Sequence, residues 1–323
     1  MIEKDMSLCG KPTDPKRFNE MDLMEREASY GRSGFALQFM LDTSLSDADR
    51  YPLKINDLVV LDIDKELAPE KIAWAGSYDY VIPNVVCVGL NGDRFHRPMY
   101  TSPNFVPFKG TVMAIDPSGR GSDELGYAVV KMLNGYLFVT ASGGLRQGYS
   151  EENLDKLCEI ARDNGVNRII IEANFGDGMF NQLLKPHLMK IYPCTVEEVR
   201  HSRQKELRII DTLEPVMNQH KLIMDRRVID EDSKAIPGMS LEDSLQYQLI
   251  YQMSRITKDR GSLIHDDGLD ALSIAVAYWI EVMGQDVDKQ IQVRKDRELQ
   301  EELNTFLGRP KKGISAIVFG RDS

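Results

Sequence analysis

The chain has 323 residues, 42% of them hydrophobic and 28% charged, which is the composition of an ordinary globular protein of about two domains. Its four cysteines lie far apart with no C-x-x-C pair, and no apolar stretch approaches the roughly 18 residues of a membrane span, so the sequence argues against a disulfide framework, a zinc knuckle, a secreted protein and a membrane protein. The net charge of −10 argues against a general nucleic-acid coat, but it is compatible with a local basic groove beside an acidic centre.

The first third of the chain predicts little regular structure. In residues 1–50 the apolar side chains recur three to four positions apart, which is typical of two short helices. Residues 52–107 hold short β-like runs broken by proline and glycine. We interpret this stretch as a linker region rather than a self-sufficient domain.

The patterns sharpen from residue 109 onward. A strand at 111–116 is followed by two more at 126–131 and 136–140, and the Asn-Gly pair between the last two is a strong hairpin signal. Residues 168–172 contain three consecutive isoleucines, which is typical of a strand buried on both faces and indicates a sheet covered by helices. This strand is predicted to lie parallel to the first. The remaining predicted elements are helices at 150–164, 178–187, 202–218, 240–255, 266–283 and 287–307, and strands at 191–199 and 222–224.

Carboxylates stand at the ends of two of these strands and at the start of one helix. Asp116 and Glu172 each end a strand, and Asp266, Asp267 and Asp270 lie in the first turn of the helix at 266–283. The carboxyl ends of neighbouring parallel strands meet at one edge of a sheet, so these acids are expected to converge there. Crowded carboxylates oppose one another's ionisation, and a hard cation such as Mg²⁺ or Mn²⁺ relieves that repulsion. The pattern predicts a metal site for phosphodiester hydrolysis or transfer.

A structural explanation competes for each of these residues. Asp116 precedes Pro-Ser-Gly and is equally compatible with the start of a turn. Glu172 follows a buried run, where an unpaired charge is costly, and this favours a functional role. Carboxylates near a helix N-terminus are good caps, which explains one of the three aspartates but not readily all three. We leave Asp123 and Asp177 outside the site, because turn formation accounts for them.

Basic residues are dense at two places, and either a solvated face or contact with phosphates explains them. Lys205 and Arg208 lie three apart and share a helix face, from which they are predicted to hold a DNA backbone without reading sequence. The predicted DNA-binding set is Arg200, Arg203, Lys205 and Arg208, and the second dense group is Arg255, Lys258 and Arg260.

Four segments taken together resemble a known family. They are Met113-Ala-Ile-Asp-Pro-Ser-Gly-Arg-Gly-Ser-Asp-Glu124, Ile169-Ile-Ile-Glu-Ala-Asn-Phe-Gly-Asp-Gly178, Lys205-Glu-Leu-Arg-Ile209 and His265-Asp-Asp-Gly-Leu-Asp-Ala-Leu272. In this order they are similar to the nuclease domain of the large terminase subunit of tailed phages, with the strongest likeness to the T7-like group.

The resemblance implies an α/β fold with a ribonuclease H-like mixed sheet and helices on both faces. It implies a metal-dependent endonuclease that cuts concatemeric double-stranded viral DNA during packaging, with two ions of Mg²⁺ or Mn²⁺. By position, Asp116 and Glu172 match the first two metal-binding acids, and the Asp266-Asp267 pair matches the third. Of the three aspartates we favour Asp267, with Asp266 and Asp270 as alternatives.

The resemblance also implies partners and a location. The partners are double-stranded DNA, a small terminase subunit, a portal protein and a packaging ATPase domain, with no membrane, and the expected location is the cytoplasm of the infected bacterial host rather than the mature virion. The sequence contains no G-x-x-x-x-G-K-[ST] phosphate loop. We therefore predict a linker and the end of an ATPase-like region at 1–108, the nuclease domain at 109–285, and a charged helix and tail at 286–323.

Two other readings stay open from the sequence. One is another ribonuclease H-like enzyme, of the resolvase or recombinase type, which shares the acids but not the Lys205–Ile209 segment. The other is an inactive docking module whose charged tail binds a portal or motor partner. The cleavage pattern and the oligomeric state do not follow from the sequence.

Overall fold

The computed structural model describes short pieces between residues 12 and 40 and then residues 50–117, 124–173, 178–234 and 236–306, with side chains described up to residue 286. Residues 21–26 are helical, in agreement with the first predicted helix, and the second lies mostly outside the described residues. The chain divides into two units, residues 1–275 and 276–323, and each is treated by itself.

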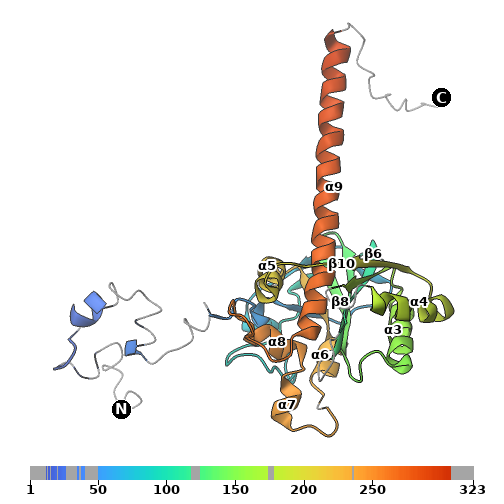
Figure 1. Ribbon diagram of the computed structural model, residues 1–323. Helices are drawn as coiled ribbons and strands as arrows, with labels where there is room; N and C mark the ends of the chain where they lie inside the picture. The colour runs from blue at the N-terminus through green and yellow to red at the C-terminus, as the bar shows by residue number, and fades with distance from the viewer. Residues whose placement is uncertain are drawn as a thin grey trace, which may run out of the picture. The chain divides into compact units, whose positions relative to one another are not determined.

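A seven-stranded sheet forms the centre of the first unit (Figure 1). Its strand order is β1-β11-β8-β7-β6-β9-β10, and every strand is parallel to the others except β7. The carboxyl ends of six strands therefore lie along one edge of the sheet. The strands are β1 (Val59–Leu61), β6 (Gly110–Asp116), β7 (Leu125–Leu133), β8 (Tyr136–Leu145), β9 (Arg168–Glu172), β10 (Thr195–Val199) and β11 (Leu222–Asp225).

The residues before β6 add small elements to this sheet. Two short antiparallel pairs precede it, and β1 itself extends the sheet beside β11, although the sequence pattern suggested a linker here. The predicted domain boundaries stay a prediction. The pairs are formed by β2 (Leu67–Pro69) with β5 (Phe105–Pro107) and by β3 (Ile72–Ala73) with β4 (Tyr100–Thr101), and the 3-10 helices are η3 (Ile55–Asp57) and η4 (Tyr78–Tyr80).

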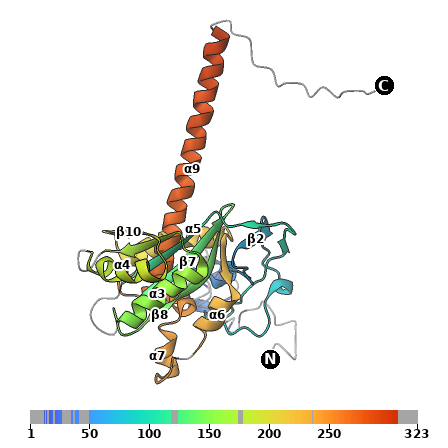
Figure 2. The ribbon, with the colours of Figure 1, turned by 90° about the vertical axis from the view of Figure 1, so that its right-hand side faces the viewer.

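Helices cover both faces of the sheet, as the triple-isoleucine strand predicted (Figure 2). Odd-numbered residues of β6 and β9, such as Met113 and Ile169, pack with α3 and α4 in one buried cluster. Even-numbered residues point to the opposite face because side chains alternate along a strand. The helices are α3 (Glu151–Asn164), α4 (Met179–Ile191), α5 (Lys205–Asn218), α6 (Arg226–Asp232), α7 (Leu241–Leu245), α8 (Leu249–Arg255) and α9 (Asp267–Phe306).

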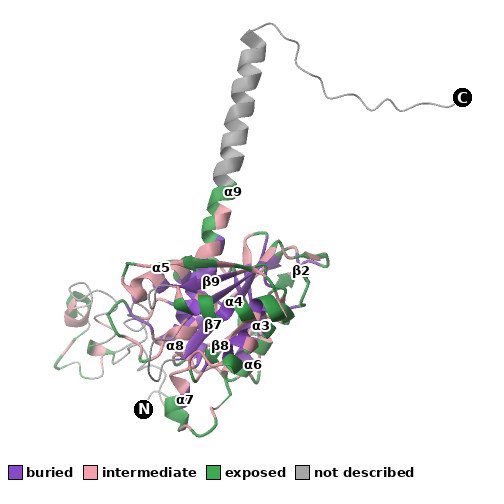
Figure 3. Ribbon diagram, turned by 45° about the vertical axis from the view of Figure 1, so that its right-hand side comes forward, coloured by how far each residue is buried: buried purple, intermediate pink, exposed green. Residues whose placement is uncertain are grey.

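Local sequence signals explain why several elements form where they do. The Ser150 side chain accepts the backbone N–H of Asn153 and caps α3, and Gly165 ends the helix in the left-handed region with φ of 65°. Asn134 and Gly135 both have positive φ, as the predicted hairpin turn requires. The buried strands stand out against the more exposed helices in Figure 3.

Three predicted boundaries were wrong. The helix predicted at 240–255 is two helices, because the Asp232 carboxylate accepts the backbone N–H groups of Leu249 and Ile250 and starts α8 anew. Helix α4 continues past Pro186 to Ile191, so β10 begins four residues later than predicted. Helix α9 runs without a break through both of the last predicted helices. None of the described helices is long and apolar enough to span a membrane.

Candidate active site

Three carboxylates from separate elements converge at one edge of the sheet. Asp116 ends β6, Glu172 ends β9, and Asp270 lies near the start of α9. One carboxylate oxygen of each lies within 4.8 Å of those of the other two. All three residues are buried, with exposed fractions of 8%, 6% and 0%. Like charges at this distance oppose one another's ionisation, so the cluster suits a hard divalent cation.

The register of the sheet brings the first two acids together. In the parallel pair of β6 and β9, Ile115 lies opposite Ile171, and Asp116 and Glu172 are the next residues of their strands. Both therefore point to the face opposite α3 and α4. The convergence predicted from the sequence for these two residues is confirmed by this geometry.

The start of α9 reaches the cluster because β7 has a glycine where the two meet. A Cβ atom on Gly126 would lie 2.2 Å from the backbone oxygen of Asp267, which is closer than real Cβ contacts allow. Gly126 itself is paired with Asp116 across β6 and β7. The absence of a side chain at residue 126 thus lets the helix deliver its carboxylates beside Asp116.

The structure places the three competing aspartates differently. Asp270 joins Asp116 and Glu172 in the cluster, whereas the preferred Asp267 does not. The Asp267 carboxylate accepts the backbone N–H of Glu124 at 3.3 Å. Asp266 accepts a hydrogen bond from Lys205. Asp270 therefore replaces Asp267 as the leading candidate for the third ligand. Asp123 and Asp177 lie outside the described residues.

Two cations of α5 lie among the acids instead of on a solvated face. The Lys205 Nζ atom is 3.1 Å from Asp116, 2.9 Å from Asp266 and 3.1 Å from Asp270. Arg208 contacts Glu172 at 3.2 Å and Asp270 at 2.8 Å. The side chains predicted to hold DNA at these two positions thus neutralise buried carboxylates in this arrangement.

The surroundings shift the pKa values of these groups in different directions. Burial raises the pKa of Asp116 well above its ordinary value, against the lowering effect of Lys205. Burial likewise raises the pKa of Asp270, although Lys205 and Arg208 oppose it. Burial also disfavours the Glu172 carboxylate, but the hydrogen bond from His201 and the charge of Arg208 outweigh it and lower the pKa.

The pKa of Lys205 is raised. Burial disfavours its charged form, but the carboxylates of Asp116, Asp270 and Asp266 outweigh that effect. Lys205 is thus held as an ammonium ion. Asp116 and Asp270, which contact Lys205, are the carboxyl groups whose pKa values are raised by burial. An additional positive charge beside them would therefore stabilise their ionised forms.

His201 is a site residue that the sequence did not indicate. Its Nδ1 atom lies 3.0 Å from a carboxylate oxygen of Glu172. If Nδ1 carries the proton that it shares with Glu172, the neutral ring has its lone pair on Nε2. A lone histidine beside basic residues is a weak signal, and its role depends on the loop after β10 that brings it to Glu172.

Two further predicted DNA-binding residues, Arg200 and Arg203, and the motif residue His265 differ in their surroundings. Arg203 is exposed and pairs with Asp211 at 2.9 Å, and Arg200 is exposed too. His265 stacks on Tyr247, with ring centroids 3.9 Å apart and an interplanar angle of 21°. It is not part of the carboxylate cluster.

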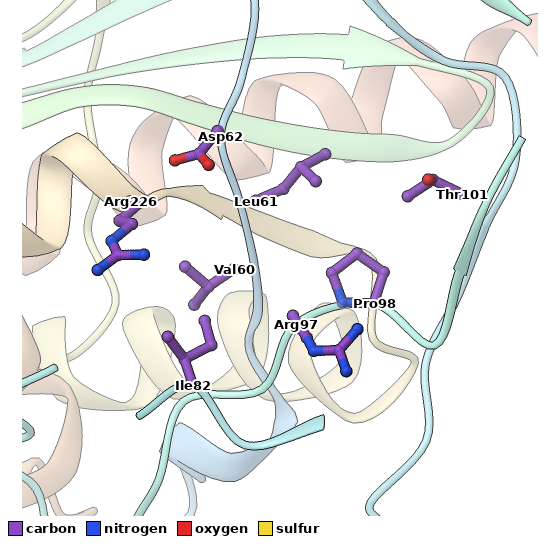
Figure 4. Close-up of a pocket in the computed structure, with 8 residues that line it drawn as sticks. All are labelled: Val60, Leu61, Asp62, Ile82, Arg97, Pro98, Thr101 and Arg226. Carbon is purple, nitrogen blue, oxygen red and sulfur yellow. The ribbon is translucent and has the colours of Figure 1, made fainter. Parts of the chain in front are cut away.

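Two hollows of the described surface differ in their chemistry. A hollow of about 200 Å³ opens at the acids and is lined by Asp116, Pro117, Glu172, His201, Arg203, Lys205 and Arg208. A hollow of about 310 Å³ near β1 has an apolar floor with Arg97, Arg226 and Asp62 around it (Figure 4). Because Asp62 is the one carboxylate lining that larger hollow, we place the candidate active site at the smaller one.

Comparison with known proteins agrees with this geometry. Residues 115–222 match the family model of the ribonuclease H-like domain of the bacteriophage T7 terminase, and the match includes Asp116, Glu172, Lys205 and Arg208. These residues belong to that terminase domain family. The chain is also 39% identical over 315 residues to the large terminase subunit of Enterobacteria phage T3, covering 98% of this chain and 54% of that protein. It thus spans about half the length of this relative.

Two solved structures that match this chain are described as terminase nucleases. The human cytomegalovirus terminase nuclease domain, soaked with Mn and bound to an inhibitor, is 14% identical, with 53% of this chain and 82% of that chain covered and a TM-score of 0.39. The large terminase nuclease from thermophilic phage G20c is 10% identical, with 71% and 98% covered and a TM-score of 0.39. The observed mixed sheet and the family match confirm the predicted ribonuclease H-like fold class.

Proposed function

We propose that this terminase domain is an endonuclease that hydrolyses phosphodiesters of double-stranded DNA with Mg²⁺ or Mn²⁺. The observation that carries the proposal is the buried cluster of Asp116, Glu172 and Asp270 inside the matched family domain. The proposed substrate is concatemeric viral DNA, cut during genome packaging. The identity to a phage large terminase subunit supports this role.

The residues present fit a divalent metal. All donors of the cluster are carboxylate oxygens, which Mg²⁺ and Mn²⁺ prefer, and the burial that raises the pKa values of Asp116 and Asp270 makes added positive charge favourable. Asp116, Glu172 and Asp270 would hold the metal, and Asp266, which shares the Lys205 ammonium group with Asp116 and Asp270, would be available to a second ion. Bound ions would supply Lewis acidity and lower the pKa of a water molecule.

The chain's own residues would organise the acids and the phosphate. His201 orients the Glu172 carboxylate through its Nδ1 contact. Lys205 and Arg208 hold the carboxylates in place and share the hollow with Arg203. Their positive charge faces the position that a phosphodiester must take beside the acids, where it would favour the charge that develops during hydrolysis.

The proposed setting follows from the relative that this chain matches. We propose that the protein acts with a small terminase subunit, a portal protein and a packaging ATPase domain, in the cytoplasm of the infected bacterial host. The identity to a phage large terminase subunit supports these partners.

The decisive experiment compares four variants on plasmid DNA with Mn²⁺, with and without chelator. We expect Asp116→Asn, Glu172→Gln and Asp270→Asn each to lower cleavage and Mn²⁺ affinity at least about 100-fold, because each removes a proposed ligand. Asp267→Asn, the matched control one helical turn away, should keep most of both. Cleavage that persists in chelator, or full activity in the first three variants, would overturn the proposal. Loss in Asp267→Asn alone would restore Asp267 as the third ligand.

A further inference from the structure

A turn between α8 and α9 carries cations that the catalytic site does not use. It comprises residues 257–262, and we call it the basic turn. Lys258 and Arg260 are both exposed at its tip, and neither forms an ion pair with any side chain that the structure describes. Exposed cations without carboxylate partners remain available to an anionic ligand.

The basic turn is hydrogen-bonded at two points to the start of α5, the helix that carries Lys205 and Arg208. The Glu206 carboxylate accepts the backbone N–H of Gly261 at 2.6 Å, and the Gln204 side chain donates to the backbone oxygen of Lys258 at 3.0 Å. Gln204 and Glu206 are the neighbours in sequence of Lys205, which contacts the acid cluster. The turn is therefore held in a fixed place relative to the candidate active site.

The turn is also closed within itself and lies close to the acids along the chain. The backbone N–H of Thr257 donates to the Ser262 hydroxyl at 3.2 Å, and Gly261 has the φ of 66° that such a tight turn needs. Asp266 is four positions after Ser262 in the chain, a span of at most about 14 Å. At a rise of about 3.4 Å per nucleotide on one strand, this corresponds to roughly four nucleotides.

An exposed apolar residue lies between the turn and the acids. Ile264 is 76% exposed, although it stands two residues before Asp266. A single exposed isoleucine is common on protein surfaces. Here it stands in the chain between the two cations of the basic turn and Asp266, whose carboxylate contacts Lys205 at the hollow. That combination matches DNA, which presents phosphates outside and apolar sugar and base edges within its grooves.

We propose that the basic turn and Ile264 form a second DNA-contact surface beside the cleavage site. Lys258 and Arg260 bind backbone phosphates a few nucleotides from the scissile bond, and Ile264 packs on sugar and base edges of the adjoining groove. The inference rests on the proposed nuclease function, because it assumes a DNA substrate. In this proposal the DNA backbone is bound by exposed side chains of the basic turn rather than by Lys205 and Arg208, which contact the buried acids.

The test measures the salt dependence of duplex DNA binding by fluorescence anisotropy, with the full chain and in chelator so that no cleavage occurs. The double variant Lys258→Ala with Arg260→Ala should reduce the slope of log affinity against log salt by about 1.8, since each phosphate contact contributes about 0.9. Between about 50 and 200 mM salt, the wild type should therefore lose about 12-fold more affinity than the variant.

Two further variants separate the contacts from a general charge effect. Lys185→Ala with Lys190→Ala removes two exposed lysines from α4, on the opposite face of the sheet, and should leave the slope unchanged. Ile264→Ser should lower affinity roughly tenfold at every salt concentration, because it removes apolar burial and no charge. Thermal unfolding should be the same in all variants, since the side chains are exposed.

The outcomes distinguish the inference from the function on which it rests. A wild-type slope in the turn variant, or an equal change in the α4 control, overturns the second contact surface even if the protein cuts DNA. A wild type that neither binds nor cuts DNA overturns the proposed function itself. A reduced slope in the turn variant alone supports the inference.

Discussion

Replacement of Gly126 by alanine tests how the third carboxylate is delivered to the site. A Cβ atom at this position would lie 2.2 Å from the backbone oxygen of Asp267 and 2.4 Å from its carbonyl carbon. These are backbone atoms in the first turn of α9, so no side-chain rotation relieves the overlap. The strand and the helix must separate for the variant to fold.

The size of the displacement follows from ordinary contact distances. Normal Cβ contacts begin at about 3.4 Å, so the start of α9 must move away from β7 by roughly 1.2 Å. Asp266 and Asp270 move with it, while Asp116 stays on β6. A misplacement of about 1 Å in a catalytic group costs on the order of 100-fold in rate, and overpacking costs about 1–3 kcal/mol of stability.

The assay follows plasmid cleavage with Mn²⁺, Mn²⁺ affinity and thermal unfolding in Gly126→Ala. Gly268→Ala is the matched control, because its added Cβ atom would meet the Gln252 side-chain oxygen at 3.5 Å, an ordinary contact, in the same helical turn. The control should keep cleavage and gain up to about 1 kcal/mol from helix propensity. Wild-type cleavage and Mn²⁺ affinity in Gly126→Ala would refute the argument that this close approach positions the acids.

Three further predictions concern single side chains. Burial raises the pKa of Asp232 to about 6, so the wild type loses free energy of unfolding as the pH rises from about 4 to 6 and this carboxyl ionises in the folded protein. Asp232→Asn has no such group, so its free energy of unfolding, measured in urea, should rise relative to the wild type by up to about 3 kcal/mol over that pH range. A difference between variant and wild type that does not change with pH would contradict this. Lys205→Met should bind Mn²⁺ more tightly but unfold at lower temperature, because the carboxylates lose their ammonium partner; weaker Mn²⁺ binding in titration calorimetry would count against it. His201→Gln should cut plasmid about 10- to 100-fold more slowly while it still binds Mn²⁺, and unchanged cleavage would remove His201 from the site.

Much of the site was predictable because it lies on strands. A run of isoleucines identifies a buried strand, and the residue that ends it must lie at the edge of the sheet. The Asn-Gly hairpin fixes β7 beside β8, and β7 pairs on its other side with β6. These patterns predict that Asp116 and Glu172 lie at the edge of the sheet. They also limit each side chain to one of two faces, because side chains alternate along a strand.

The choice among the three aspartates was left open by the sequence because a helix offers more choices than a strand, and the geometry now favours Asp270. Asp266 and Asp270 are four residues apart and share a helix face, whereas Asp267 lies about 100° away around the axis. Lys205 accordingly contacts Asp266 and Asp270, and Asp267 turns toward β7. The spacing was visible in the sequence, but the rotation of the helix depends on its contact with Gly126 across about 140 residues of chain.

The positions of Lys205 and Arg208 could not be predicted from spacing at all. Their separation puts them on one face of α5, but a charged face usually points to water, and the pattern does not say otherwise. The reversal has an electrostatic cause. Five carboxylates lie at or near this edge of the sheet, and Lys205 and Arg208 at the start of the amphipathic helix α5 form ion pairs with them. Burial of a cation is tolerable there because several acids share its charge.

Under the proposed function, this arrangement would explain how a chain with a net charge of −10 presents a site to DNA. The acids Asp116, Glu172, Asp266, Asp267 and Asp270 carry −5 when ionised, and Lys205 with Arg208 brings the sum to −3. Two divalent ions would add +4 and give +1, so the same edge would change from repelling phosphate to attracting it. On this account metal binding and DNA binding are linked, and the outward cations of the basic turn supply the part of the attraction that does not depend on metal.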